Sequence, residues 1–479
     1  MKKNCFLLCL LAINSVAYSQ APAIEWQKCF GGSWDDGAYS LIQTPDNGFI
    51  LVGSSESNDG DVSGNHGGTD VWVVKTDENR NIIWQKCLGG TNYDRGHSIQ
   101  ITSDGGYIVA GFSNSINGQV IDNHGDYDMW IIKLDNSGNI IWQKCLGGSD
   151  YEEAQSIVQT ADGGFIVTGS TKSYDGDVIG IHGSSDVWVV KLDNSGNIIW
   201  QKCLGGSGFE KSTAIELTTD GGYIISGYSS SLDGDLSGNN GLLDCWIIKL
   251  DNSGNITWQK SFGGSLVENS SSIAQISDGG YILTGYTASN DGDVIGNHGA
   301  EDIWVLKLNM AGDLVWQKSL GGSFNERASS ILETSDGGYV LTGSTSSDDG
   351  DVSGNHGGFN DIWTVKLDSF GNVIWQKCIG GTGEENASTI TSIINNEYVI
   401  SGFSESNNGD INGNHGYGDF WIVKLSNGTS NVFEQALPQK KELLKILNLL
   451  GQEVQYTPNT LLIYQYSNGT TEKVFTSEK

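Results

Sequence analysis

The chain has 479 residues, of which 57 are acidic and 26 are basic, so its formal net charge is −31. Its 67 glycines come with only 4 prolines, which excludes collagen, and a hydrophobic share of 37% is too high for a disordered chain. A surface this acidic repels phosphate groups, so nucleic acid is excluded as a partner.

Residues 1–19 have the pattern of a secretory signal peptide. Lys2 and Lys3 form a basic start, residues 6–12 are a short apolar run, and Ala17 and Ser19 are the small residues that precede a cleavage site. The run is far shorter than the roughly 20 residues that span a bilayer, and no other segment approaches that length. We expect no membrane span. The protein should be exported across the inner membrane and then be secreted or held on the outer-membrane surface.

The middle of the chain is one unit repeated seven times. Trp-Gln-Lys recurs at spacings of 58 or 59 residues, and a second tryptophan follows each copy by 46 or 47 residues. A fixed period of this length indicates a repeat architecture. The Trp-Gln-Lys tryptophans are Trp26, Trp84, Trp142, Trp200, Trp258, Trp316 and Trp375.

Each unit contains four short alternating segments separated by glycine-rich turns. In the second unit they cover residues 98–102, 107–112, 129–134 and 139–146. The turns Asp-Gly-Gly and Asn-Ser-Gly supply the positive φ angles that tight hairpins need. Seven units of four strands predict an all-β fold, a seven-bladed β-propeller over residues 24–425. A lone fourth strand at 24–30 should complete the last blade and close the ring.

The repeat resembles a known bacterial family. The stretches Asp-Val-Trp-Val-Val-Lys, Gly-Asn-Ile-Ile-Trp-Gln-Lys and Asp-Gly-Gly-Tyr-Ile look like the SBBP-type seven-bladed propeller repeat over roughly residues 24–425. The resemblance implies a fold of surface and secreted bacterial proteins and no single activity.

Pairing the third and fourth strands across their short turn places Trp72 opposite Lys86 and Val74 opposite Trp84, all on one face. Lys86 would then lie over Trp72 as a cation–π partner. Blade-to-blade core is the favoured interpretation of the two tryptophan series, and sugar-binding aromatic pairs are the alternative.

Six cysteines remain after the signal peptide. Five share one repeat position and fall in different blades, beyond the reach of a disulfide, and Cys245 is predicted to face Ser261. We therefore expect free, mostly buried thiols.

The long loop of each unit carries a form of Asp-Gly-Asp-x-x-Gly-Asn-His-Gly-x-x-Asp. Carboxylate and amide oxygens suit Ca²⁺, which takes six to eight oxygen ligands, while Asp and Asn beside Gly also form plain side-chain turns. Gln119 interrupts the pattern in the second unit and Asn240 in the fourth. The candidate metal ligands are Asp59, Asp61, Asp70, Asp177, Asp186, Asp235, Asp244, Asp293, Asp302, Asp351, Asp361, Asp410 and Asp419.

The repeats differ in the loops between blades, where aromatic residues stand beside carboxylates. These rings suit glycan or protein binding, or they merely cap blade ends. They are Trp34, Tyr93, Tyr151, Phe209 and Phe324. His97 is the one histidine outside the acidic loops, and we interpret it as a rim residue. The favoured hypothesis is a secreted or cell-surface propeller that binds an extracellular glycan or protein in adhesion. The alternative is an extracellular carbohydrate-active enzyme, a glycosidase or lyase, with an uneven pocket at the channel mouth.

The composition changes after residue 425, and 426–439 is predicted to be a linker. The pattern Lys-Glu-Leu-Leu-Lys-Ile-Leu-Asn-Leu-Leu-Gly-Gln-Glu-Val, followed by Asn-Thr-Leu-Leu-Ile-Tyr-Gln-Tyr, resembles the C-terminal sorting domain of Bacteroidota type IX secretion substrates. It covers residues 440–479 and implies the type IX secretion machinery as a partner. The alternation in 461–466 predicts small β-strands.

Overall fold

The computed structural model describes residues 21–393, 397–426, 443–448, 452–457, 459–466 and 471–475. The predicted signal peptide and nearly all of the predicted linker lie outside these residues. The chain divides into two compact units, Met1–Gly428 and Thr429–Lys479. Within the described residues every element is a β-strand, and none forms a helix that could cross a membrane.

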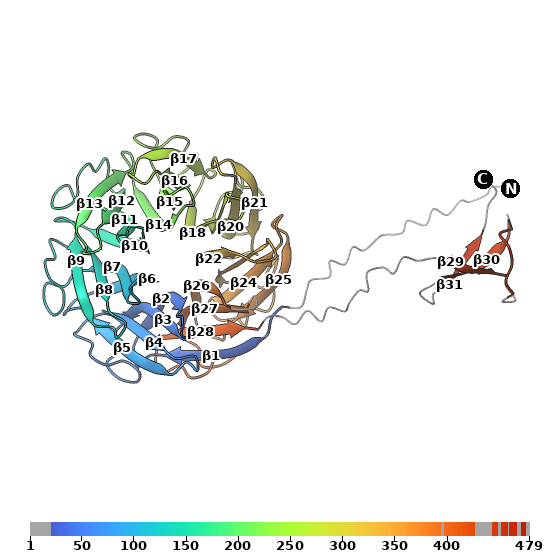
Figure 1. Cartoon of the computed structure of the whole chain (residues 1–479), viewed down its shortest axis with the longest axis horizontal. Coiled ribbons are helices and arrows are strands. Elements are labelled where there is room, and N and C mark those ends of the chain that lie inside the picture. Colours follow the sequence, from blue (N-terminus) through green and yellow to red (C-terminus); the bar gives the residue numbers. More distant parts are fainter. Residues whose placement is uncertain are drawn as a thin grey trace. The chain divides into compact units, whose positions relative to one another are not determined.

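The first unit is a ring of seven four-stranded antiparallel sheets, which confirms the prediction of a seven-bladed β-propeller (Figure 1). Six blades use four consecutive strands each. Their bounds are β2 Asp36–Gln43, β3 Phe49–Ser55, β4 Asp70–Thr76, β5 Ile82–Leu88; β6 Asp94–Ile101, β7 Tyr107–Ser113, β8 Asp128–Leu134, β9 Ile140–Leu146; β10 Glu152–Gln159, β11 Phe165–Thr171, β12 Asp186–Leu192, β13 Ile198–Leu204; β14 Glu210–Leu217, β15 Tyr223–Ser229, β16 Asp244–Leu250, β17 Ile256–Phe262; β18 Glu268–Gln275, β19 Tyr281–Thr287, β20 Asp302–Leu308, β21 Leu314–Leu320; β22 Glu326–Glu333, β23 Tyr339–Thr345, β24 Asp361–Leu367, β25 Val373–Ile379.

The seventh blade joins the two ends of the ring. It consists of β26 Glu385–Ile393, β27 Glu397–Ser404, β28 Asp419–Leu425 and the N-terminal strand β1 Ile24–Phe30. β1 pairs antiparallel with β28, with Phe30 opposite Phe420. The Trp421 indole N–H donates to Gln27 Oε1 at 2.9 Å. The predicted closure is confirmed.

The first strand of each blade lies toward the centre of the ring and the fourth lies at its circumference (Figure 1). The loop between the second and third strands and the loop between blades leave the ring on one face, where Thr69 forms a parallel bridge with Tyr93. We call this face the loop rim; in the first blade it comprises residues 56–69 together with 31–35 before β2. The opposite face carries the tight hairpin turns.

Seven hydrophobic clusters fill the spaces between neighbouring blades. The third-strand tryptophan of every blade is at most 1% exposed. Trp84 of one blade packs in the same cluster as Trp130 of the next. Both tryptophan series therefore belong to the blade-to-blade core. Truncating a buried tryptophan to alanine typically costs roughly 3–5 kcal/mol.

The predicted register between the third and fourth strands is wrong by one residue. Trp72 faces Cys87 rather than Lys86, and Lys75 faces Trp84, because a bulge leaves Ile83 unpaired next to the turn. Trp72 and Lys86 consequently lie on opposite faces, so the predicted cation–π contact does not form. Trp72 instead donates from its indole N–H to Gln85 Oε1 at 2.8 Å.

The equivalent bulge between β16 and β17 makes the predicted contact of Cys245 wrong as well. Cys245 faces Phe262, and Ser261 faces Trp246. The conclusion about the thiols is confirmed, because all six described cysteines are free and buried.

The second unit contains a three-stranded sheet of β29 Leu443–Leu447, β30 Leu461–Tyr466 and β31 Thr471–Phe475. β30 pairs antiparallel with both neighbours, and the strand predicted at 461–466 is confirmed.

Deleting residues 24–30 should lower the thermal midpoint sharply and promote aggregation. The deletion leaves β28 with an unpaired edge and removes Phe30 from the cluster between the last and first blades. Thermal melting and size-exclusion chromatography test this. A chain that ends after Gly428 keeps β1 and should melt like the parent. Monomeric, unchanged melting of the deletion variant would contradict closure through β1.

Candidate functional site

Two fully buried carboxylates meet at each junction between blades. One begins the third strand of a blade and the other begins the first strand of the next, as Asp70 of β4 and Asp94 of β6 do. A Cβ on Gly89 would lie 2.8 Å from Asp70 Oδ1 and 2.5 Å from Asp94 Oδ2, so glycine is required between them. The equivalent pairs are Asp128 and Glu152, Asp186 and Glu210, Asp244 and Glu268, Asp302 and Glu326, Asp361 and Glu385, and Asp419 and Asp36.

The two carboxylates of a junction are hydrogen-bonded differently. Asp94 accepts from the Gly90 N–H and the Ser115 hydroxyl, both at 2.8 Å, and from the Ser113 hydroxyl. Asp70 accepts through Oδ2 alone, from the backbone N–H of His66 at 3.0 Å and its Nδ1 at 2.6 Å, while the buried Oδ1 accepts no hydrogen bond. Burial raises the pKa of Asp70 to about 6.

The loop histidines connect one blade to the next. His415 binds Asp419 of its own blade through Nδ1 at 2.6 Å, and its Nε2 lies 4.0 Å from Asp61 of the following blade. His356 repeats the arrangement, with Nε2 3.5 Å from Asp410 Oδ2. At these two junctions the histidine thus lies between a buried carboxylate of its own blade and a rim carboxylate of the next.

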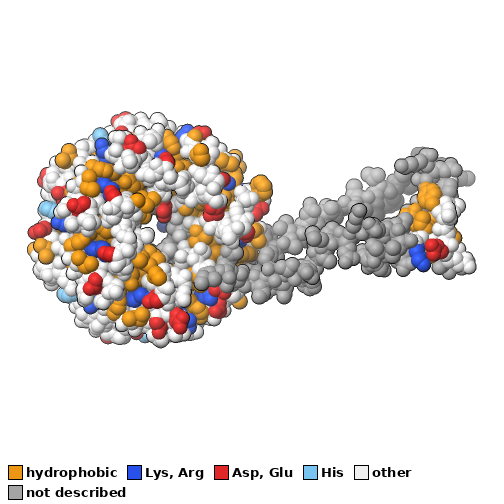
Figure 2. All heavy atoms as spheres, viewed as in Figure 1, with side chains coloured by type: hydrophobic (Ala, Val, Ile, Leu, Met, Phe, Trp, Pro, Cys, Tyr) orange, Lys and Arg blue, Asp and Glu red, His pale blue; other side chains and the backbone are white. Residues whose placement is uncertain are grey.

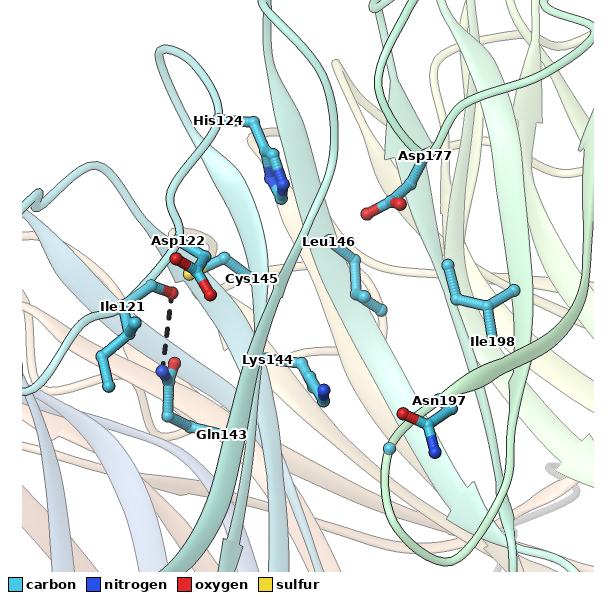
Figure 3. Close-up of a pocket in the computed structure, with 11 residues that line it drawn as sticks. Ile121, Asp122, His124, Gln143, Lys144, Cys145, Leu146, Asp177, Asn197 and Ile198 are labelled. Carbon is cyan, nitrogen blue, oxygen red and sulfur yellow. Dashed lines mark hydrogen bonds between the residues drawn. The ribbon is translucent and has the colours of Figure 1, made fainter.

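One junction opens into a groove of about 350 Å³ (Figure 3). His124 and Asp177 lie on opposite sides of it, on the long loops of consecutive blades, and Lys144 projects from β9 below them. Burial disfavours the charged form of His124, but its hydrogen bond to Asp128 and the nearby charges of Asp128 and Asp177 raise its pKa.

The first aspartate of the loop motif has a structural task. Asp59 Oδ1 accepts the backbone N–H of Ser33 at 2.7 Å, and the same bond recurs between Asp175 and Ser149. The second aspartate reaches the glycine beside the buried pair, as Asp235 does with the Gly205 N–H at 3.2 Å. Among the described residues no group of three or more His, Cys, Asp or Glu side chains is arranged to hold a metal ion. The calcium site stays a prediction based on residue type.

Three of the five aromatic residues that were predicted to bind a ligand are exposed on the loop rim. Trp34 is 57% exposed and stacks on Tyr417, itself 67% exposed, with ring centroids 5.9 Å apart and planes 16° from parallel. Tyr93 and Phe324 are also exposed.

The other two predicted aromatic residues are half-buried. The Tyr151 hydroxyl donates to Glu153 at 2.7 Å. Phe209 stacks on Tyr228 with centroids 6.0 Å apart. These two rings pack within the propeller rather than standing free on the rim.

The structure also contains a cavity at the centre of the ring, where the enzyme alternative expects an uneven pocket. The ring is hollowed at its centre (Figure 2), where a cavity of about 430 Å³ is lined by residues of all seven first strands. We call it the channel cavity. Each of these strands has a bulge after its third residue. The seven bulged residues all line the cavity: Tyr39, His97, Gln155, Thr213, Ser271, Ser329 and Ser388.

His97 is therefore a channel residue, and the interpretation of it as a rim residue is wrong. Its side chain is 13% exposed, and its Nδ1 lies 3.0 Å from the carbonyl oxygen of Ala154 in the next blade. A carbonyl only accepts, so Nδ1 carries the proton. Burial lowers the pKa of His97. The sequence does contain a feature that marks this position. The residue type at this position changes between repeats, while its neighbours in the strand stay small or hydroxylated.

One charged pair stands in the channel cavity. Glu153 accepts from Lys211 at 2.8 Å, from Tyr151 at 2.7 Å and from Gln155 at 2.5 Å. Burial alone would raise the pKa of Glu153, but His97, the Lys211 charge and the hydrogen bonds from Lys211 and Tyr151 hold it below its usual range. Glu153 is thus an ionised, fully engaged carboxylate.

Comparisons with known proteins leave the activity open. No protein-family profile matches the chain. A stretch of 170 residues, 33% of the chain, is 24% identical to part of the regulatory protein FlaEY of Caulobacter vibrioides, and the match spans 18% of that protein.

Solved structures resemble the chain at low identity. The Neurospora crassa Pan2 WD40 domain matches 81% of this chain and 89% of its own at 9% identity, with a TM-score of 0.46. Sqt1 from Chaetomium thermophilum matches 80% and 82% at 14% identity and 0.42. YCF48 bound to D1 peptide matches 85% and 97% at 9% identity and 0.45. Nothing about ligands follows from these similarities.

Stability should fall as the pH rises from 5 to 8. A carboxyl whose folded pKa is about 6, against an ordinary 3.8, stabilises the fold while protonated and loses that contribution as the pH passes 6. The loss is about 1.4 kcal/mol per such group over this interval. Asp70→Asn should reduce the pH dependence measured by urea unfolding. Asp77→Asn, in an exposed turn, should leave it unchanged, and equal slopes for both variants would contradict the assignment.

If the rim aspartates bind Ca²⁺, millimolar CaCl₂ should raise the melting temperature more than NaCl of equal ionic strength, by mass action on the folded state. Changing Asp61 and Asp70 together to Asn should remove part of the calcium-specific gain. If calorimetry detects no Ca²⁺ uptake and the melting temperature is the same in EDTA, the calcium prediction is wrong and these side chains have only the structural roles described above.

Proposed function

We propose that this protein is an exported binding propeller that captures or adheres to an extracellular protein or glycan through its loop rim. The observation that supports this most is the stacked pair of Trp34 and Tyr417, two large rings that are more than half exposed at one junction. Tyr93 lies on the rim of the following junction and is also exposed. Exposed, rigid aromatic groups beside carboxylates are typical of binding hot spots for proteins and of platforms for sugar rings.

The alternative, a carbohydrate-active enzyme, has less support from the geometry. A glycosidase needs two carboxyl groups about 5–9 Å apart, one of them with a raised pKa. Glu153 is the one carboxylate among the residues that line the channel cavity, and its low pKa makes it a poor proton donor. The buried pairs at the blade junctions are hydrogen-bonded within the loops and fully shielded from a substrate.

The rim proposal predicts that replacing Trp34 and Tyr417 together by alanine weakens binding to any partner found on a glycan or matrix-protein array by at least tenfold, as hot-spot residues do. Phe370→Ala is the matched control, because Phe370 is 74% exposed but lies in the turn between β24 and β25 on the opposite face. Equal affinities for the two variants would place the binding surface elsewhere.

The route to the surface belongs to the same proposal. The signal-peptide pattern at residues 1–19 and the resemblance of 440–479 to a type IX sorting domain support export to the outer-membrane surface or the medium. Ser426 is the last described residue before the second unit, and its N–H donates to the Ala23 carbonyl at 2.9 Å.

A chain that ends after Gly428 should therefore keep the melting profile of the parent but fail to reach the surface of its host. Protease accessibility on intact cells and immunoblots of the medium measure delivery. Surface display of the truncated chain would exclude the sorting-domain assignment while leaving the rim proposal intact.

A further inference from the structure

One arginine of the loop rim is held by a ring and a carboxylate of the preceding blade. At the junction between the fifth and sixth blades, the guanidinium carbon of Arg327 lies 4.8 Å from the ring centroid of Tyr286. Its Nη2 donates to Glu301 at 2.9 Å, and its Nε donates to the same carboxylate. Cation–π attraction and a bidentate ion pair therefore hold one arginine side chain across two blades.

The closing junction, where the seventh blade meets the first, has the same backbone without the arginine. Gly37 occupies the repeat position of that arginine, and Gly418 occupies the position of its carboxylate partner. Phe403, which is half-buried, occupies the position of the tyrosine ring. A Cβ on Gly37 would lie 3.8 Å from the Tyr39 hydroxyl and 3.9 Å from Phe403 Cδ2, which are ordinary contact distances. A side chain can therefore be accommodated beside Phe403.

The two large exposed rings of the rim stand at this same junction. Tyr417 directly precedes Gly418, and its ring stacks on that of Trp34. The Trp34 N–H donates to the Ser57 hydroxyl at 2.9 Å, which fixes the backbone of this ring. Within the described residues no lysine or arginine lies over either ring. Rigid, exposed aromatic groups of this kind are typical of the centre of a protein interface.

The charged side chains beside these rings are carboxylates. Asp35 and Glu405 are exposed, and Glu384 is half-buried. Burial and the nearby charges of Glu384 and Asp35 raise the pKa of Glu405. Among the residues that the structure describes, no lysine or arginine forms an ion pair with any of the three. A cation that binds among them relieves their mutual repulsion.

We propose that this surface, which we call the closing patch, binds a basic segment of an extracellular protein through an arginine side chain. The arginine lies beside Gly37, against the ring of Phe403, and pairs with the carboxylates, as Arg327 does within its own junction. Neighbouring residues of the segment pack on the exposed ring pair. The closing patch comprises Trp34, Asp35, Gly37, Phe403, Glu405 and Tyr417.

The inference rests on the binding function proposed above and specifies its partner. A protein with exposed arginines is favoured over a neutral glycan, because a glycan offers the carboxylates no charge with which to pair. The net charge of −31 also favours a basic partner, since it raises the rate of encounter.

Fluorescence anisotropy of the full chain with a labelled peptide of alternating glycine and arginine tests the proposal. At physiological ionic strength, peptides with glutamine or glutamate in place of arginine should bind at least about tenfold more weakly. Asp35→Asn together with Glu405→Gln should weaken binding of the arginine peptide about tenfold. Asp126→Asn together with Asp150→Asn is the matched control and should change it less than about twofold. Both control residues are exposed on the rim of the junction between the second and third blades.

Gly37→Arg provides a second, independent variant. The introduced side chain can lie over Phe403 as Arg327 lies over Tyr286, so it should abolish binding of the arginine peptide. Thermal melting shows whether the variant folds. If it does not fold, the two pairs of charge substitutions still decide the question.

The inference is wrong if the glutamine peptide binds as tightly as the arginine peptide, if both pairs of charge substitutions weaken binding equally, or if folded Gly37→Arg binds like the parent. A glycan whose binding depends on Trp34 and Tyr417 but not on Asp35 and Glu405 would also overturn it, while the rim proposal would stand. Arginine-peptide binding that survives replacement of Trp34 and Tyr417 by alanine would instead contradict the role of the ring pair in the rim proposal.

Discussion

The structure depends on one constraint: each blade buries both of its faces against its neighbours. The central strands of every sheet are almost entirely buried, and seven apolar clusters, one for each junction, hold the ring together. In an open row of such sheets, the first and the last would each expose an apolar face to water. The row therefore has to close into a ring. β1 provides the closure by pairing with β28, which joins residues about 400 positions apart in the chain.

Closing the ring concentrates acidic groups where blades meet. Asp70 and Asp94 are brought within contact distance of Gly89, away from water, and only part of their hydrogen-bonding capacity is satisfied. Like-charged neighbours and burial both favour a proton on one of them. The short contact of 2.6 Å between His415 Nδ1 and Asp419 partly offsets this cost. The acidic loops thus have a structural role between blades that requires no ligand.

Individual blades differ where the repeat varies. Residues that carry the fold, such as Trp72 and Asp70, recur in every blade, whereas the channel residues His97, Gln155 and Ser271 occupy one position with different side chains. The same holds for Trp34 and Tyr417, which meet at the junction formed by the closing blade. In a ring of nearly identical blades, one site can differ from its six equivalents only where the sequence departs from the repeat.

The sequence by itself determined the number of blades, the strand content, the closure by residues 24–30 and the free cysteines, because the 58-residue period and the alternation within each strand report local structure directly. Tertiary structure alone decided the register of Trp72, which a one-residue bulge at Ile83 moves away from Lys86. It also decided the pairing of Asp70 with Asp94 and the meeting of seven bulge residues in one cavity. These contacts join different blades, and their geometry follows from the curvature of the ring and from bulges, neither of which leaves a periodic signal in the chain.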